Sequence, residues 1–202
     1  MKLVCLDLEG VLVPEIWIAF AEATGISALR RTTRDEPDYN KLMAYRLAIL
    51  DEHRLKLSDI QRIISGMEPL EGALSFCNAL RERCQFVILS DTFEQFAKPL
   101  MQKLVYPVLF CNTLEVDSSG RICAWHLRQT DGKRRMVEAF ASCNIEVFAA
   151  GDSFNDLSMI HAAKAGCLFR APKQICAANA EIPQTESYAG LLEQIDAFLN
   201  GV

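Results

Sequence analysis

Four short stretches of the sequence carry side chains that can act as nucleophiles, acids, bases or metal ligands. Three of them follow apolar runs that are typical of buried strands, and one precedes a helical stretch. Taken one at a time, each is equally well explained as a helix cap or a polar turn at the end of a strand. The candidate residues in these stretches are Asp7, Glu9, Ser90, Asp91, Lys133, Asp152, Asn155 and Asp156.

These side chains would converge if the strands run parallel, because parallel strands point their carboxyl ends the same way. Carboxylates that meet in one crevice repel one another unless a cation joins them, and an all-oxygen ligand set favours a hard ion such as Mg²⁺. Mg²⁺ readily shares its ligands with phosphate groups, and Lys133 and Ser90 can hold phosphate oxygens. The four stretches together therefore predict a Mg²⁺ site that handles a phosphoryl group.

The spacing of the carboxylates predicts a role for each. Asp7 is the candidate nucleophile, because attack of a carboxylate on phosphorus forms an aspartyl-phosphate and divides one displacement into two. Glu9 follows closely and is placed to protonate the leaving oxygen and later to take a proton from the attacking water or alcohol. Asp152 and Asp156 share a face at a predicted helix start. We assign Asp152 to the metal and Asp156 to a supporting or metal-linked role.

The elements that must position these residues alternate between strands and helices. Such an alternation predicts an α/β fold with a doubly wound parallel sheet, in which ligands bind outside the carboxyl ends of the strands. A hairpin is predicted from residues 113–116 and 122–127 around a turn rich in polar residues and glycine. The runs predicted to form buried strands are 3–6, 86–89, 108–110, 147–150 and 167–169.

The stretch after the first strand reads as helical and is too long for a single crossover. Gly25 is predicted to end its first helix and Ser58 to cap its third. The predicted helices span residues 15–23, 38–53 and 58–65. We therefore predict a small helical cap inserted into a catalytic core, with the cap at 14–68 and the core at 1–13 and 69–202.

Two charged residues of the predicted cap stand on apolar helix faces. Arg46 has apolar neighbours one turn before and one turn after it, and Glu15 is placed similarly. Because a buried charge is costly unless it is paired, the two either pair with each other or bind the carboxylate and ammonium groups of an amino acid. Met43 lies one turn before Arg46 and could line the same pocket, although a methionine there is more typical of the core.

Composition bounds the partners and the compartment. A formal net charge of −5 and the lack of a basic stripe argue against nucleic acid as a partner. Apolar stretches are shorter than the roughly 18 residues of a membrane span, so we expect a soluble protein with no membrane partner. The eight cysteines contain no C-x-x-C pair and lie mostly in apolar runs, which predicts reduced core thiols and a cytoplasmic location. Oligomeric state is left open.

The same residues resemble the motifs of a known family. The segment Asp7-Leu8-Glu9-Gly10-Val11, together with Ser90, Lys133 and the segment Gly151–Asp156, resembles the four motifs of the haloacid dehalogenase superfamily. Over nearly its full length the chain resembles the phosphoserine phosphatases of that superfamily. Within them it is similar to the bacterial enzymes that also transfer phosphate from phosphoserine to homoserine.

The resemblance implies a Rossmann-like core with a small helical cap. It implies that Asp7 is the nucleophile and that Mg²⁺ is held by Asp7, the backbone carbonyl of Glu9, and Asp152. Phosphate contacts are implied for Ser90, Lys133 and Asn155, with Asp91 grouped among the substrate-binding residues. By the same resemblance, Glu15 and Arg46 hold the amino and carboxylate groups of the substrate.

One departure from the family pattern and two rival functions are left open. Most of the superfamily has aspartate where this chain has Glu9, and the extra carbon–carbon bond of about 1.5 Å moves the carboxyl group. One rival is a phosphatase of another small phosphomonoester. The other is a phospho-accepting signalling module, which would need no cap. The sequence does not distinguish water from homoserine as the acceptor.

Overall fold

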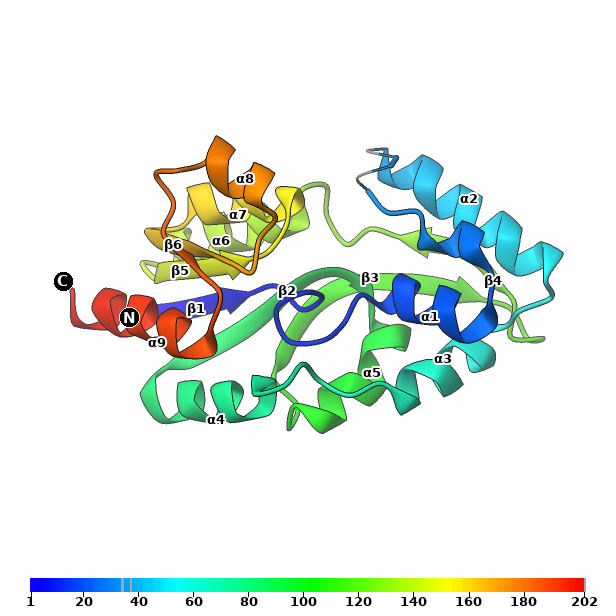
Figure 1. Cartoon of the computed structure of the whole chain (residues 1–202), viewed down its shortest axis with the longest axis horizontal. Coiled ribbons are helices and arrows are strands. Elements are labelled where there is room, and N and C mark those ends of the chain that lie inside the picture. Colours follow the sequence, from blue (N-terminus) through cyan, green and yellow to red (C-terminus); the bar gives the residue numbers. More distant parts are fainter. Residues whose placement is uncertain (34, 37, 202) are drawn as a thin grey trace.

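The computed structural model describes residues 1–33, 35–36 and 38–201. Its centre is a seven-stranded sheet in the order β4-β3-β2-β1-β5-β6-β7, in which every neighbouring pair is parallel except β3 and β4 (Figure 1). The first strand, β1, lies in the interior of the sheet. The next three strands in the chain lie on one side of it, and the last three lie on the other side. The strands are β1 (Lys2–Leu6), β2 (Gln85–Phe93), β3 (Val108–Val116), β4 (Ile122–His126), β5 (Glu146–Gly151), β6 (Ala165–Phe169) and β7 (Gln184–Thr185).

Strand β1 is buried on both faces, as its apolar run predicts. Val4 and Leu6 belong to one hydrophobic cluster, and Leu3 and Cys5 belong to the other. The alternation follows from strand geometry, since successive side chains point to opposite faces of a sheet. The sheet therefore has an apolar layer on each side, and both layers are covered by helices.

The covering helices divide between the two faces. Figure 1 shows α6 and α7 above the sheet and α4, α5 and α9 below it. This confirms the predicted α/β fold with a doubly wound, mostly parallel sheet. The helices outside the cap are α4 (Ala73–Arg83), α5 (Glu94–Lys103), α6 (Gly132–Ser142), α7 (Leu157–Ala162), α8 (Lys173–Ala178) and α9 (Tyr188–Asn200).

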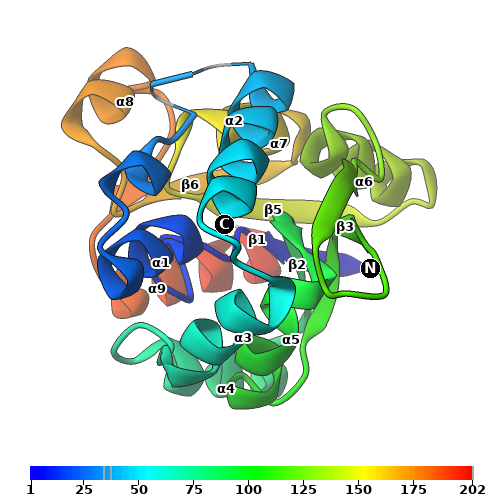
Figure 2. The ribbon, with the colours of Figure 1, turned by 90° about the vertical axis from the view of Figure 1, so that its right-hand side faces the viewer.

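A helical insert follows β1, as predicted. Figures 1 and 2 show α1, α2 and α3 grouped at the end of the molecule toward which the parallel strands run. The division of the chain into a core and a cap at residues 14–68 stays a prediction. The elements of the insert are α1 (Ile16–Thr24), the short 3-10 helix η1 (Ser27–Arg30), α2 (Tyr39–Glu52) and α3 (Leu57–Gly66).

The ends of these helices test the local predictions. Gly25 ends α1 with a left-handed φ of 70°, as predicted. Ser58 does not cap α3, because that helix already begins at Leu57. The carboxylate of Asp59 accepts the N–H of Lys56 at 2.9 Å, so the helix starts earlier than a serine cap would place it.

Two strands differ from their predicted extents. Strand β2 continues beyond Leu89 to Phe93, with an irregularity between those residues, so Ser90 and Asp91 lie within the strand and not after it. The runs at 108–110 and 113–116 form one strand, β3, whose first half pairs with β2 and whose second half pairs with β4. Pairing with β2 along its first half and with β4 along its second half makes the two predicted runs one strand.

The β3–β4 hairpin extends from the sheet to the helical insert. The N–H of Leu57 donates to the carbonyl of Gly120 at 3.0 Å. The guanidinium of Arg121 binds both carboxylate oxygens of Asp51, at 2.7 and 2.5 Å, on the exposed side of α2. The insert is thus attached to the sheet through the hairpin as well as through the chain.

The structure also tests the predictions that were made from composition. All eight cysteines are free, and Cys5, Cys77 and Cys167 are buried. Cys123 and Cys143 are exposed, so the prediction of core positions is wrong for these two, which lie at a strand edge and a helix end. Within the described part of the chain, no helix combines the length and the hydropathy of a membrane span.

Candidate active site

Asp7 is held at the carboxyl end of β1 by contacts from strand β5 and from helix α6. Its N–H donates to the carbonyl of Ala150 in β5 at 2.9 Å, and only 4% of the residue is exposed. Lys133, from the first turn of α6, donates to Asp7 Oδ1 at 2.7 Å and to Asp156 Oδ1 at 2.6 Å. The structure therefore joins three of the predicted site residues in one buried ion-paired group.

The loop after β5 brings in the second carboxylate pair. Asp156 Oδ2 accepts the N–H groups of Asp152 and Ser153 at 3.1 and 3.0 Å and the Ser153 hydroxyl at 2.7 Å. A side chain on Gly151 would collide with Asp156, because a Cβ there would lie 2.3 Å from Asp156 Cγ. With Lys133 on its other oxygen, Asp156 already accepts hydrogen bonds at both oxygens. Its carboxylate therefore shapes the loop that carries Asp152.

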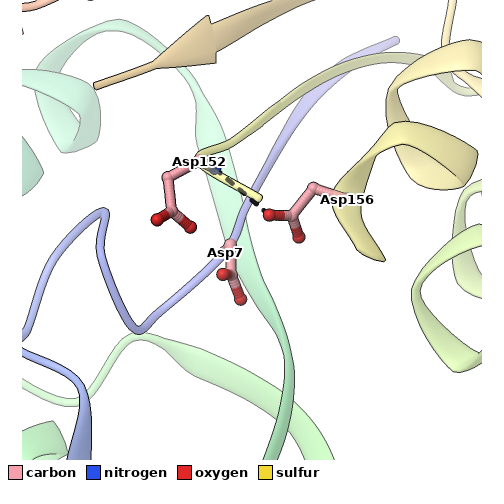
Figure 3. A group of neighbouring side chains, drawn as sticks. All are labelled: Asp7, Asp152 and Asp156. Atoms are coloured by element: carbon pink, nitrogen blue, oxygen red, sulfur yellow. Dashed lines mark hydrogen bonds between the residues drawn. The ribbon is translucent and has the colours of Figure 1, made fainter. Parts of the chain in front are cut away.

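Three carboxylates of the site form a group that fits a hard divalent cation. Oxygens of Asp7, Asp152 and Asp156 lie within 4.8 Å of one another, and Figure 3 shows their carboxylates converging. Gly10, with a left-handed φ of 81°, leaves room for Asp152, since a Cβ would lie 2.4 Å from its Oδ2. Lys133 balances one of these three negative charges, so the oxygen set has the charge for a divalent ion to balance the rest.

Burial and charge shift the pKa values within this group. Burial raises the pKa of Asp7 well above its ordinary value, the charges of Asp156 and Asp152 raise it further, and Lys133 opposes them. Burial disfavours the charged form of Lys133, but the carboxylates of Asp156 and Asp7 outweigh it and hold the pKa of the ammonium well above its usual range. The lysine therefore remains a fixed positive charge.

The residues from β2 and from the η2 turn (Phe154–Asp156) lie beside this group. Asn155 Nδ2 donates to Asp91 Oδ2 at 2.9 Å, and the same oxygen lies 3.7 Å from Lys133 Nζ. Ser90 is 7% exposed, and its Oγ accepts the N–H of Thr92 at 3.2 Å. The serine hydroxyl hydrogen is left for another acceptor.

A cavity of about 200 Å³ joins the carboxylate group to the helical insert. Met43 and Asp156 are outside its lining; Met43 is fully buried and touches the cavity only through Arg46. The predicted site residues that line it are Asp7, Glu9, Glu15, Arg46, Ser90, Asp91, Lys133, Asp152 and Asn155.

Glu9 stands where the sheet meets the insert. Its Oε2 accepts the N–H of Ile16 at 2.8 Å, which places the carboxylate at the N-terminal end of α1. Burial first, and then the negative charge of Glu15, raise the pKa of Glu9 to about 7, while hydrogen bonds from Ile16 and Thr92 act against the rise. The longer side chain of glutamate thus reaches the first turn of α1, a helix of the insert.

Arg46 lines the cavity from α2 of the insert and is 6% exposed. Its Nη2 donates to the carbonyl of Arg31 at 2.9 Å, and its Nη1 contacts Met43 Sδ at 3.9 Å. Its Nε is buried and has no hydrogen-bond partner among the described residues. Burial lowers the pKa of the guanidinium to about 10. Glu15 is exposed, and the described residues include no ion pair between it and Arg46.

Comparison with known proteins decides the family. A family model of haloacid dehalogenase-like hydrolases matches residues 1–164. The chain is a haloacid dehalogenase-like hydrolase. It is 56% identical over 191 residues to phosphoserine phosphatase ThrH of Pseudomonas aeruginosa, covering 95% of this chain and 93% of that protein. It is 53% identical over 194 residues to a phosphoserine phosphatase of Pseudomonas syringae pv. tomato, covering 96% and 82%.

Solved structures agree on the fold of this hydrolase. A substrate-bound phosphoserine phosphatase complex has a TM-score of 0.78 to it at 20% identity, over 95% of this chain and 97% of that one. The predicted resemblance to the haloacid dehalogenase superfamily, and to its phosphoserine phosphatases, is confirmed. The signalling-module alternative has no support from these matches.

Trp17, Tyr39 and Thr92 are among the residues that line the cavity of the hydrolase and that the sequence did not predict for the site. Trp17 faces Arg46, Tyr39 donates its hydroxyl to the carbonyl of Asp91 at 3.0 Å, and Thr92 contacts Glu9. The first two lie in helices of the insert, where an aromatic residue is indistinguishable from core until the partner is known. The sequence gives one hint that these two residues face the site. Trp17 and Tyr39 lie next to polar residues in the chain, at the starts of α1 and α2.

Proposed function

We propose that this hydrolase removes the phosphate of phosphoserine through a covalent phosphate on Asp7. The observation that carries the proposal is that one cavity is lined from the core by Asp7 and Lys133, which we call its sheet end, and from the helical insert by Arg46 and Glu15, which we call its insert end. Phosphoserine has a phosphate at one end and an ammonium and a carboxylate at the other, so its charges complement both ends. The names of the two Pseudomonas relatives support the same substrate.

In the first half of the proposed reaction, a carboxylate oxygen of Asp7 forms a bond to phosphorus as the ester oxygen departs. Lys133 donates to Oδ1 of Asp7, which orients the carboxylate and offsets the repulsion between two anions. The departing serine alkoxide takes a proton from Glu9. The products of this half are serine and phosphorylated Asp7.

In the second half, an acceptor oxygen attacks the phosphorus of phosphorylated Asp7 and the acyl-phosphate bond breaks. Glu9 takes the proton of the acceptor, which restores both carboxyl groups to their starting state. With water the product is inorganic phosphate. With homoserine it is phosphohomoserine, and we propose that this chain uses both acceptors.

We propose Mg²⁺ as the cofactor, held by Asp7, the backbone carbonyl of Glu9, and Asp152. When bound, the ion offsets the charge between the nucleophile and the phosphate and polarises the phosphoryl oxygens. Asp156 supports this set by fixing the loop of Asp152 and by sharing Lys133 with Asp7.

The same cavity supplies candidate contacts to the rest of the substrate. We assign the phosphate oxygens to Ser90, Lys133 and Asn155, with Asp91 holding the amide of Asn155. Arg46 would take the carboxylate through its unpaired Nε, and Glu15 the ammonium group. Met43 is assigned to the pocket through its contact with the guanidinium of Arg46.

The decisive experiment is phosphate release from phosphoserine by Asp7→Asn. We expect loss of activity to background, because an amide cannot form the covalent intermediate. Asp196→Asn, on the exposed side of α9, is the matched control and should retain wild-type activity. Phosphate release by Asp7→Asn at a rate near that of the wild type would end the proposal.

Two further assays test the acceptor and the metal. Incubation with phosphoserine and homoserine should yield phosphohomoserine, and release of free phosphate alone would leave a plain phosphatase. Treatment with a chelator should abolish activity, and added Mg²⁺ should restore it. Full activity after exhaustive chelation would remove Mg²⁺ from the proposal.

A further inference from the structure

The guanidinium of Arg46 is held mainly by groups that leave its hydrogen-bonding capacity unused. Its charge lies over the ring of Trp17, with Cζ 4.5 Å from the ring centroid. Among the described residues, one nitrogen donates to the carbonyl of Arg31, a second meets only the sulfur of Met43, and Nε has no hydrogen-bond partner. The face of an aromatic ring attracts a cation electrostatically. This attraction does not use the N–H donors at the edge of the guanidinium. The contact with Trp17 therefore fixes the guanidinium and spares its donors.

Trp17 is itself fixed by aromatic residues of the sheet side of the molecule. Its ring meets Phe96 of α5 edge-on at 5.6 Å, and Phe96 meets Phe93 edge-on at 5.6 Å. Phe93 is the last residue of β2, the strand that carries Ser90. A continuous line of aromatic contacts thus runs from the strand at the phosphate end of the cavity to the arginine at its other end.

We propose that Trp17 positions Arg46 for the carboxylate of the substrate and so determines specificity for an amino-acid phosphate. This inference rests on the proposed phosphoserine activity. Trp17 is a positioning residue, since it acts through Arg46. Without the ring, the guanidinium could turn toward other acceptors in the cavity, and its unpaired Nε would no longer be presented in a fixed place.

The test is a double-mutant cycle with phosphoserine as substrate. Trp17→Leu should raise KM about tenfold, the effect of losing a desolvated cation–π contact, and should change kcat by less than about threefold. In the Arg46→Ala background the same change should alter KM by less than about twofold, because its partner is gone. An equal rise in KM in both backgrounds would mean that Trp17 only packs the insert, and would overturn the inference.

A second measurement leaves Trp17 in place, in case the leucine variant does not fold. The chain has two tryptophans, so Trp125→Phe leaves Trp17 as the only one. In the inactive Asp7→Asn background, phosphoserine should change the fluorescence of Trp17, and Arg46→Ala should abolish that change. Inorganic phosphate, which lacks a carboxylate, should leave the emission unchanged. Emission that phosphoserine does not alter, or that inorganic phosphate alters equally, would overturn the inference.

The two proposals fail in different ways. A wild-type chain that releases no phosphate from phosphoserine would overturn the proposed function. A wild-type chain that does release it, together with independent effects of Trp17 and Arg46, would overturn only the role of Trp17.

Discussion

The two ends of the cavity differ in how their charged side chains are paired within the protein. At the sheet end, Lys133 bridges Asp7 and Asp156, and every oxygen of Asp156 accepts a hydrogen bond. At the other end, Arg46 retains a buried Nε that no described residue pairs with, and Glu15 is exposed. At the sheet end, Lys133 and Asp156 are held in place by partners within the protein, whereas at the other end the guanidinium of Arg46 has a donor left over.

This difference assigns chemistry to one end and selection to the other. Groups that already hold one another in place are preorganised, so they stabilise charge that develops during a reaction without rearranging. A buried donor with no partner costs free energy until a ligand supplies an acceptor, so it rewards one ligand and penalises others. We expect substitutions at the sheet end to affect all substrates, and substitutions at the Arg46 end to affect only phosphoserine.

The largest effect is expected from Lys133→Met. The change removes the positive charge beside the nucleophile and leaves two buried carboxylates without their partner. We expect kcat to fall at least about a thousandfold with phosphoserine and with p-nitrophenyl phosphate. We also expect the free energy of unfolding to fall by about 3 kcal/mol, measured by urea denaturation. Lys41→Met, an exposed lysine of α2, is the control for a lost charge. Activity within tenfold of wild type would contradict a preorganised sheet end.

Arg46→Ala should separate the two ends most clearly. Removing the guanidinium takes away the candidate carboxylate partner, and we expect kcat/KM for phosphoserine to fall about a hundredfold. The rate with p-nitrophenyl phosphate, which has no carboxylate, should change less than about threefold. Arg62→Ala, an exposed arginine of α3, controls for charge. An equal loss on both substrates would show that Arg46 does not distinguish the carboxylate.

The sequence was sufficient for the parts that depend on local pattern. The apolar run before Asp7 predicts a buried central strand, and Gly25 predicts the end of α1, because strand burial and a left-handed cap are read from neighbouring residues. It failed where a distant partner decides the outcome. The continuation of β2 through Ser90 and Asp91 depends on pairing with β3, and the short elements α8 and β7 are too brief to show a period.

The candidate site divides in the same way. The meeting of Asp7 and Asp152 could be predicted because the carboxyl ends of parallel strands converge whatever the loops do. The partner of Glu9 was not found, since its contact with the N–H of Ile16 depends on how the chain turns into α1. Trp17 and Tyr39 were missed because only tertiary packing distinguishes an aromatic residue facing a cavity from one facing the core.

Tyr39→Phe tests whether the hydrogen bond between α2 and β2 couples the two ends of the cavity. Its hydroxyl donates to the carbonyl of Asp91 at 3.0 Å, so it connects the start of α2 to the strand at the phosphate end. Loss of this hydrogen bond, worth about 1 kcal/mol, should lower kcat/KM for phosphoserine about fivefold. Steady-state kinetics beside Tyr45→Phe, a half-exposed tyrosine of the same helix, isolates the contact. If both variants behave alike, the ends of the cavity are not coupled through Tyr39.

The smallest effect is expected at the outer edge of the insert, where Arg121 binds Asp51. The hydrogen bond from Arg121 lowers the pKa of Asp51. The pair therefore stabilises the fold at pH values above the ordinary pKa of aspartate, about 4. This contribution is lost as the pH falls through the lowered pKa of Asp51. Because both side chains are exposed and screened by salt, Asp51→Asn should lower Tm at pH 7 by at most about 3 °C.

Differential scanning calorimetry from pH 7 to pH 3, at low and high salt, would measure this edge contact. The difference in Tm between wild type and Asp51→Asn should shrink both on acidification and in salt, while kcat/KM for phosphoserine at pH 7 stays within twofold. A large loss of activity would mean that the hairpin sets the position of Arg46 through α2. The selective end of the cavity would then depend on the sheet twice, through the aromatic line from Phe93 and through the β3–β4 hairpin.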